Sequence, residues 1–213
     1  MRGNKVPPPP AAFATVNIAT IRSGSVLHRT HAAAFRSSQF NPFLGQPTRF
    51  APFADASGTC VPSLYAATGR EAAAFESIFH DIAPIARFKT VRLSTVQSRS
   101  VSRIAPNKDL AVAKLYSPDL KAWNIARMNL IETPKSTYQK TARWAQALHT
   151  AFPDIKGLIW TSRQCDPESC LILFGDRVRE SDFDVLDCID VATNPNLLLE
   201  LRGYGKRAGI TII

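Results

Sequence analysis

The feature that most constrains the fold is a strand that leads directly into a helix between residues 63 and 82. The segment "SLYAAT" (63–68) has the length and composition of a short strand. Thr68 and Glu71 then have the spacing of a capping box, which predicts a helix over residues 69–82. Its apolar residues repeat at the spacing of one buried helix face: Phe75, Ile78, Phe79 and Ile82. This succession indicates a sheet with a helix packed on it.

Glu76 is the ionisable residue beside that apolar face. It follows Phe75 by one position, which corresponds to a rotation of about 100° around a helix. Glu76 therefore borders the core and does not face open water. The periodicity leaves two interpretations open, a solvated carboxylate on the helix flank or a functional one.

Further periodic segments predict an α+β fold. Strands are expected at residues 25–32, 84–96, 157–163, 170–176, 183–191 and 209–213, and 157–163 and 170–176 are expected to form a hairpin. Helices are expected at 136–152, opened by the capping box Ser136-Thr-Tyr-Gln139 and ended by Pro153, and at 194–205, closed by a glycine. Tyr138, Ala142, Ala145, Leu148 and Phe152 line one face of the first of these helices. The stretch 97–134 reads as shorter elements and loops.

The 213 residues suit one domain with a mixed or antiparallel sheet core flanked by helices. The strand order is not determined by the sequence. Residues 1–12, with four consecutive prolines, are expected to form an extended arm, and residues 13–213 the single domain. No run approaches the roughly 20 apolar residues of a membrane span, and the N-terminus lacks the order of a secretory signal, so we expect a cytoplasmic protein.

The four cysteines are expected to be buried thiols, since the chain is too long for a disulfide scaffold. Cys165 and Cys170 are farther apart than in the usual zinc-binding pair, and no second Cys/His pair completes a tetrahedral site. We therefore expect no metal.

The formal net charge of +9 is spread unevenly along the chain. Residues 1–54 hold six Lys/Arg and no acid, while residues 154–190 hold nine of the seventeen acids. The basic quarter suits a nucleic acid, a phosphate-bearing small ligand or a transit peptide. Pro7 to Pro10 speak against the transit peptide, because they prevent an amphipathic helix there.

Several polar residues are predicted at strand ends or beside loops. They are Arg29, Arg49, Tyr65, Glu76, Ser162 and Arg163. No nucleophile elbow, Walker loop, Gly-rich dinucleotide turn or HExxH occurs in the sequence. The common hydrolase, kinase and Rossmann interpretations therefore lose support.

The motifs "VLHRTH", "TRF", "LYAATGREAAAFESIFHD", "YQKTARWAQALH" and "GLIWTSRQ…SCLILF" occur in an order that resembles the RES-domain family, toxins of bacterial Xre/RES toxin–antitoxin pairs. The resemblance covers roughly residues 20–175. It implies a fold similar to ADP-ribosyltransferase toxins and cleavage of the nicotinamide–ribose bond of NAD. The reaction would be hydrolysis, phosphorolysis or transfer of ADP-ribose to a protein.

The conserved polar residues of the family fall here on Arg29, Arg49, Tyr65, Glu76 and Ser162. One position departs from the pattern: Thr48 precedes Arg49 where the family usually has glycine. If that glycine needs a positive φ, threonine would be strained there.

The resemblance gives each of these residues a role that its chemistry suits. Guanidinium groups pair with phosphates, so Arg29 and Arg49 would bind the pyrophosphate. The carboxylate of Glu76 would stabilise the ribosyl cation or orient the nucleophile. Tyr65 would stack on nicotinamide or bond a ribose hydroxyl, and Ser162 would donate to ribose or position the glutamate. The expected catalytic residues are Glu76, Arg29 and Tyr65, and the expected substrate-binding residues are Arg49, Ser162, Arg163 and His28. His80 is a further candidate.

The resemblance also implies partners. NAD would be a substrate and not a resident cofactor, with inorganic phosphate as a co-substrate in the case of phosphorolysis. An Xre-type antitoxin would cover the active-site cleft, would provide the only link to nucleic acid, and would allow a toxin homodimer within the complex. Two alternatives from other classes stay open: a non-catalytic nucleic-acid-binding domain that uses the positive charge, and an interaction scaffold without activity.

Overall fold

A computed structural model describes residues 6–83 and 85–213 of the chain, and it shows an eight-stranded sheet in the order β1-β6-β7-β8-β3-β2-β5-β9. The strands are β1 (Ile18–Ile21), β2 (Leu27–Ala32), β3 (Ser63–Ala67), β5 (Arg99–Pro106), β6 (Leu110–Lys114), β7 (Gly157–Thr161), β8 (Ser169–Phe174) and β9 (Phe183–Asp190). All neighbouring pairs are antiparallel except β6 and β7. The predicted α+β class with a mixed sheet is confirmed.

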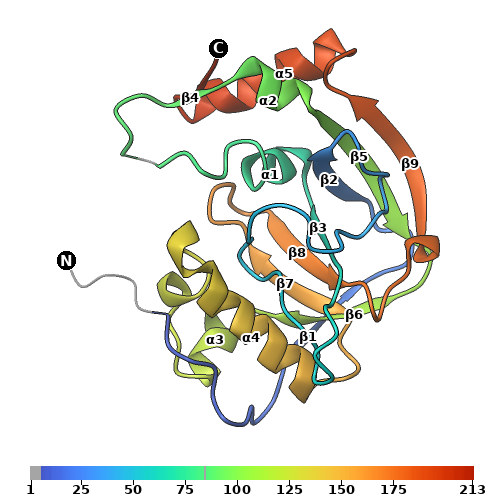
Figure 1. Ribbon diagram of the computed structural model, residues 1–213, viewed down its shortest axis with the longest axis vertical. Coiled ribbons are helices and arrows are strands. Elements are labelled where there is room, and N and C mark those ends of the chain that lie inside the picture. The colour runs from blue at the N-terminus through green and yellow to red at the C-terminus, as the bar shows by residue number, and fades with distance from the viewer. Residues whose placement is uncertain (1–5, 84) are drawn as a thin grey trace.

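The helices cover the two ends of this curled sheet and one lies within the curl (Figure 1). They are α1 (Arg70–Phe75), α2 (Leu93–Gln97), α3 (Ser117–Ala122), α4 (Tyr138–Ala151) and α5 (Pro195–Arg207). Helices α3 and α4 lie at one end and α2 and α5 at the other, while α1 lies between them. A second sheet pairs β4 (Thr90–Val91) in parallel with β10 (Thr211–Ile212) beside α5.

The sheet is weakly joined between β2 and β3. These strands share a single residue pair, His28 with Ala67, whereas β2 pairs with β5 over six positions and β3 pairs with β8 over five. Side chains on the two faces of the sheet pack into two separate hydrophobic cores. A cleft lined by residues of both strands lies at the open joint between β2 and β3.

The N-terminal segment packs along α4. Residues 6–12 have no regular secondary structure, Val6 is buried, and the Pro7 carbonyl accepts a hydrogen bond from the Trp144 indole at 2.8 Å. Phe13 then contacts the rings of Trp123 and Trp144 edge-on. Residues 1–5 of the predicted arm lie outside the described residues, and the boundary after residue 12 stays a prediction.

Most predicted elements are confirmed, namely the hairpin of β7 and β8, strands β2, β3 and β9, helix α5 and helix α4 with its buried face. Helix α5 continues through Gly205, the residue expected to close it, to Arg207. The strand predicted at 84–96 is wrong: only Thr90–Val91 is extended, and a helix begins at Leu93. Ile85 and Phe88, which made that segment apolar, are exposed. Pro84 lies outside the described residues.

The helix predicted at 69–82 is shorter than expected and ends at Phe75. The capping box does not form, because the Thr68 hydroxyl donates to the Glu168 carboxylate and not to the helix. At the other end, the Ser77 hydroxyl donates to the Ala73 carbonyl and competes with the backbone bond that would extend the helix. The expected apolar face is nevertheless largely buried, with Ile82 partly exposed.

The second capping box, at residues 136–139, is also absent. A 3₁₀ turn over Lys135–Thr137 precedes α4, and the Thr137 hydroxyl donates to the Pro134 carbonyl. The expectation of buried cysteines holds for Cys165 and Cys170, whereas Cys60 and Cys188 are exposed. None of the helices in the described part of the chain is long and apolar enough to cross a membrane.

Candidate active site

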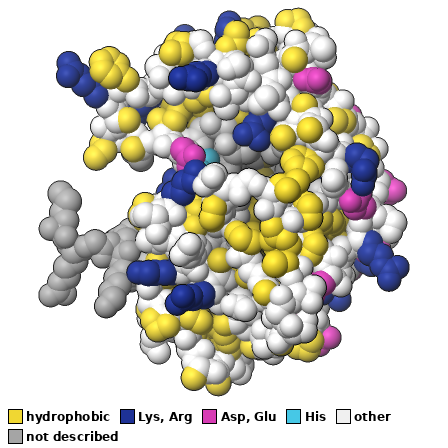
Figure 2. All heavy atoms as spheres, in the orientation of Figure 1, with side chains coloured by type: hydrophobic (Ala, Val, Ile, Leu, Met, Phe, Trp, Pro, Cys, Tyr) yellow, Lys and Arg dark blue, Asp and Glu magenta, His cyan; other side chains and the backbone are white. Residues whose placement is uncertain are grey.

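A cleft of about 600 Å³ lies where β2 and β3 separate. Its walls are the inner side of α1 with the turn that follows it, and the loop 41–52. Figure 2 shows the surface indented on the left, with acidic and histidine side chains in the indentation and Lys or Arg side chains around it. Five of the seven predicted site residues line the cleft, namely His28, Arg29, Arg49, Tyr65 and Glu76, and a sixth, Ser162, bonds to Glu76. Arg163, the seventh, also bonds to Glu76.

Glu76 is the C-cap residue of α1, and its carboxylate is held on one side only. Its Oε1 accepts hydrogen bonds from the Ser162 hydroxyl at 2.8 Å and from the Arg163 backbone N–H at 3.2 Å. Its Oε2 has no hydrogen-bond partner among residues 6–83 and 85–213. One oxygen is therefore fixed, and the other is available to a ligand in the cleft.

Ser162 is a positioning residue for that carboxylate. It is fully buried, does not line the cleft, and accepts hydrogen bonds from the N–H groups of Gln164 and Cys165, each at 3.1 Å. These bonds orient its hydroxyl hydrogen towards Glu76. Of the two roles expected for Ser162, this geometry favours positioning the glutamate over contact with ribose.

Arg49 is a buried cation whose contacts are with neutral groups of Thr133 and Tyr138. Its side chain is 3% exposed and donates from Nη1 to the Thr133 hydroxyl at 3.1 Å and the Thr133 carbonyl at 3.4 Å. The guanidinium lies 5.4 Å from the ring centre of Tyr138, and Nη2 has no partner. No carboxylate of the described chain forms an ion pair with it, although Glu76 is close enough to act on its charge. Burial lowers the pKa of Arg49.

Arg29 is a second buried cation of this kind. It is 7% exposed and donates from Nη1 to the carbonyls of Ser37 at 2.7 Å and Arg36 at 3.4 Å. It forms no ion pair within the described ranges, and burial lowers its pKa to about 10. Unpaired charges are costly to bury. Two of them beside one cleft indicate a site for an anion.

Tyr65 anchors the loop that carries Arg49. Its hydroxyl accepts a hydrogen bond from the Phe50 N–H at 3.0 Å and lies 2.9 Å from the Thr48 hydroxyl. Burial raises the pKa of Tyr65, so the phenol stays protonated. The ring lines the cleft edge-on to Trp160. The hydroxyl is thus engaged with the loop, and the ring is the part that faces a ligand.

Thr48 is accommodated without the strain considered from the sequence. The non-glycine residues with positive φ in the described chain are Phe43 and Asn124, and Thr48 is not among them. Its hydroxyl donates to the Ala51 carbonyl at 3.1 Å and bonds Tyr65. Threonine therefore adds contacts that glycine could not make.

Arg163 and His28 occupy different surroundings. The Arg163 guanidinium donates to the carbonyls of Thr133 at 3.3 Å and His80 at 3.1 Å, so it links the two segments that carry these residues. His28 lines the cleft from β2, its Nδ1 has no hydrogen-bond partner among the described residues, and burial lowers its pKa.

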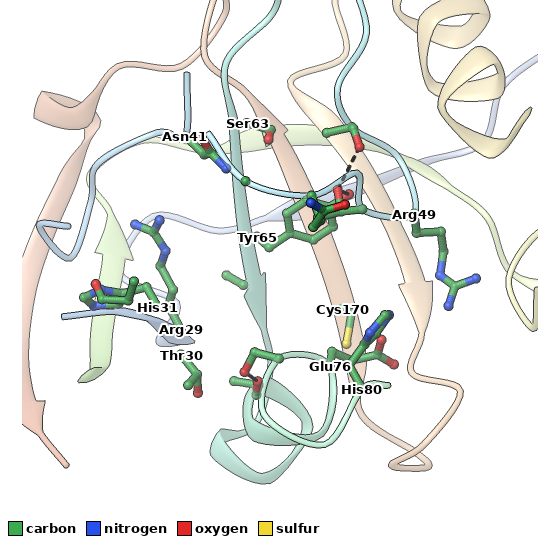
Figure 3. A pocket seen from close by; sticks show the side chains of 18 of the residues that line it. Arg29, Thr30, His31, Asn41, Arg49, Ser63, Tyr65, Glu76, His80 and Cys170 are labelled. Atoms are coloured by element: carbon green, nitrogen blue, oxygen red, sulfur yellow. Dashed lines mark hydrogen bonds between the residues drawn. The ribbon is translucent and has the colours of Figure 1, made fainter. Parts of the chain in front are cut away.

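The predicted residues lie on two sides of the cleft. Figure 3 shows Arg29 on one side of Tyr65, and Glu76 and Arg49 on the other side.

A chain of hydrogen bonds beside Glu76 was not anticipated from the sequence. The Tyr138 hydroxyl bonds Nε2 of His80, Nδ1 of His80 bonds the Asp81 carboxylate at 2.8 Å, and Lys135 donates to Asp81 at 3.3 Å. Burial lowers the pKa of His80, although Asp81 opposes this shift. The helical periodicity assigns Tyr138 to the buried face of α4, and no sequence motif connects it to His80. In the described residues, no three His, Cys, Asp or Glu side chains are grouped as a metal ion would require.

The fold and the cleft define a small α+β protein in which a ligand-sized cleft is lined by the Glu76 carboxylate and by two buried arginines that form no ion pair with the described residues. The profile of the RES domain matches residues 25–187, most of the chain and all candidate residues. The protein therefore belongs to the RES-domain family.

A solved structure is similar in fold. A chain in the crystal structure of the M. tuberculosis MbcT–MbcA toxin–antitoxin complex superimposes with a TM-score of 0.59 at 19% identity. The similarity covers 86% of this chain and 92% of that chain. No curated protein matches the sequence.

Proposed function

We propose that this protein is the toxin of a toxin–antitoxin pair and that it cleaves the nicotinamide–ribose bond of NAD. The observation that carries the proposal is the Glu76 carboxylate, which Ser162 and Arg163 hold by one oxygen while the other is left for a ligand. The unpaired charge of Arg49 lies on the same side of the cleft. This combination suits a substrate that carries phosphates and develops positive charge as it reacts.

The chemistry requires little more than these groups. The C1′–N bond breaks with its electron pair leaving on the nicotinamide nitrogen, which neutralises the pyridinium and places positive charge on the ribose. A fixed carboxylate lowers the energy of that cation. Water then forms a C1′–O bond and releases a proton, or phosphate forms the same bond and yields a sugar phosphate. Glu76 would contact the ribose, and Arg29 and Arg49 would neutralise the pyrophosphate.

The toxin role rests on family membership and on the fold of the neighbour. The chain has a RES domain, and its resemblance to this family implies a toxin that is paired with an antitoxin. The structure that is similar in fold was solved as a toxin–antitoxin complex. An antitoxin that covered the cleft would exclude NAD and silence the enzyme. We propose an antitoxin of the Xre type for this chain.

The test is release of nicotinamide from NAD by the purified protein, with and without inorganic phosphate. We expect release by the wild type, loss with Glu76→Gln, and retention with Glu71→Gln. Glu71 is a matched control, because it lies on the same helix and pairs with Arg207 outside the cleft. ADP-ribose, its 1″-phosphate or a modified protein as product would separate hydrolysis, phosphorolysis and transfer. Absence of release from the wild type under all of these conditions would contradict the proposal.

A further inference from the structure

The cleft extends well beyond Glu76. Its lining also includes Arg29, Thr30, Phe35, Phe43 and Arg99, which together we call the β2 end. Arg29 and Thr30 belong to β2, the Phe35 N–H donates to the carbonyl of Ala32 at the end of β2, and Arg99 pairs with Ala32. Figure 3 shows Arg29 and Thr30 at this end, away from Glu76 and His80. A cleft of about 600 Å³ lies within the usual range for small-molecule sites. Cleavage of a ribosyl bond at Glu76 would occupy only one of its two ends.

Phe43 is held at the β2 end in an unfavourable backbone conformation. Its φ of 80° lies in the left-handed region, which bulky side chains rarely adopt. Asn41 brackets it: the Asn41 amide donates to the Leu44 carbonyl at 2.9 Å and accepts from the Leu44 N–H at 2.7 Å. The Asn41 backbone is in turn bonded to Ser63 at the start of β3. The turn is therefore anchored to the sheet, and the strain is maintained by its surroundings.

Phe43 and Phe35 contribute little to folding. Both are partly exposed, neither belongs to a hydrophobic core of the described chain, and neither forms an aromatic pair there. Glycine or asparagine would satisfy a positive φ at position 43 at lower cost. A phenylalanine in this position has a face available to a planar ligand in the cleft.

The β2 end also contains polar groups that have no partner among the described residues. The Arg29 guanidinium has no counter-ion in the described part of the chain. The Thr30 hydroxyl and Nε of Arg99 are buried without hydrogen-bond partners. Aromatic side chains and a guanidinium that line the same cleft suit a base that is linked to phosphate.

We propose that the β2 end is a purine-nucleotide subsite, in which Phe43 and Phe35 contact the base and Arg29 binds the adjoining phosphate. This inference rests on the proposed function, and it assigns the adenylate half of NAD to the side of the cleft opposite Glu76. The nicotinamide ribose then lies at Glu76, and the pyrophosphate passes Tyr65.

The test compares NAD with nicotinamide mononucleotide, which has the same scissile bond but no adenylate. Base stacking on an aromatic side chain accounts for an effect of about tenfold in affinity. Phe43→Ala should therefore raise the KM for NAD about tenfold and leave the KM for the mononucleotide unchanged, while Phe43→Tyr should retain the wild-type values. Phe88→Ala is the matched control, because Phe88 is 77% exposed and does not line the cleft.

Two outcomes would overturn the subsite: unchanged constants for NAD with Phe43→Ala, or equal losses for both substrates. Titration calorimetry with ADP-ribose separates this inference from the proposed function. Binding that Phe43→Ala weakens about tenfold supports the subsite even if the protein releases no nicotinamide. Binding that is undetectable in the wild type, or insensitive to Phe43→Ala, contradicts it.

Discussion

Ser162→Ala isolates the positioning of Glu76 from its charge. The substitution removes the 2.8 Å hydrogen bond to Oε1 and leaves only the 3.2 Å bond from the Arg163 N–H. A hydrogen bond to a charged group contributes about 1.5–3 kcal/mol. If that energy holds the carboxylate for the transition state, kcat falls by roughly 10- to 150-fold. The N–H groups of Gln164 and Cys165 also lose their acceptor, so stability should fall by about 2–4 kcal/mol.

The assay is nicotinamide release at saturating NAD, at a temperature where circular dichroism shows the variant to be fully folded. Ser98→Ala is the control, because the Ser98 hydroxyl bonds only to the Thr95 carbonyl at an exposed helix end. It should leave kcat unchanged. A wild-type kcat in folded Ser162→Ala would refute the reasoning that Ser162 positions the glutamate.

Three further predictions concern the arginine, tyrosine and histidine of the cleft. Arg49→Met should weaken NAD binding at least about tenfold in calorimetry without lowering the thermal midpoint, since it removes a buried charge that forms no ion pair with the described residues. A drop in the midpoint would contradict this. Tyr65→Phe should cost about 1–3 kcal/mol in urea unfolding, because the Phe50 N–H loses its acceptor, and unchanged stability would count against the anchoring role. Burial holds the pKa of His80 below its ordinary 6.5, so its contribution to stability is complete above pH 6.5 and is lost as the pH falls through the lowered pKa. His80→Gln should reduce the acid sensitivity of the urea midpoint between pH 7.5 and 5, and an unchanged pH dependence would show that His80 does not titrate there.

Periodicity predicted the elements whose burial is regular along the chain. The hairpin of β7 and β8 and the buried face of α4 are of this kind, because one face of each is apolar throughout. The strand predicted at 84–96 is wrong because burial is not regular along this segment. Ile85 and Phe88 are residue types that favour strands, but both are exposed. The strands β5 and β6 lie in the stretch 97–134, which reads as shorter elements and loops because residues such as Arg103, Pro106 and Asn107 interrupt its apolar pattern.

The candidate site was predictable as a set of residues but not as an arrangement. The segment from Tyr65 to Glu76 indicated a strand and a helix that bring a carboxylate to the border of the core, and the structure places both residues in the same cleft. The Ser162 bond to Glu76 spans 86 residues of sequence, so only the tertiary fold brings the two together. The Tyr138–His80 contact and the strained Phe43 likewise depend on pairings and dihedral angles that a single sequence does not encode locally.

The central claim is that Glu76 acts on the transition state of ribosyl cleavage. The most direct measurement is kcat for NAD in wild type and Glu76→Gln, together with the NAD dissociation constant of each by calorimetry. Loss of a preorganised electrostatic group should lower kcat by about 10²- to 10³-fold, with a dissociation constant within about threefold of wild type, since the amide retains the shape of the carboxylate. Equal kcat values in the two proteins would contradict the account.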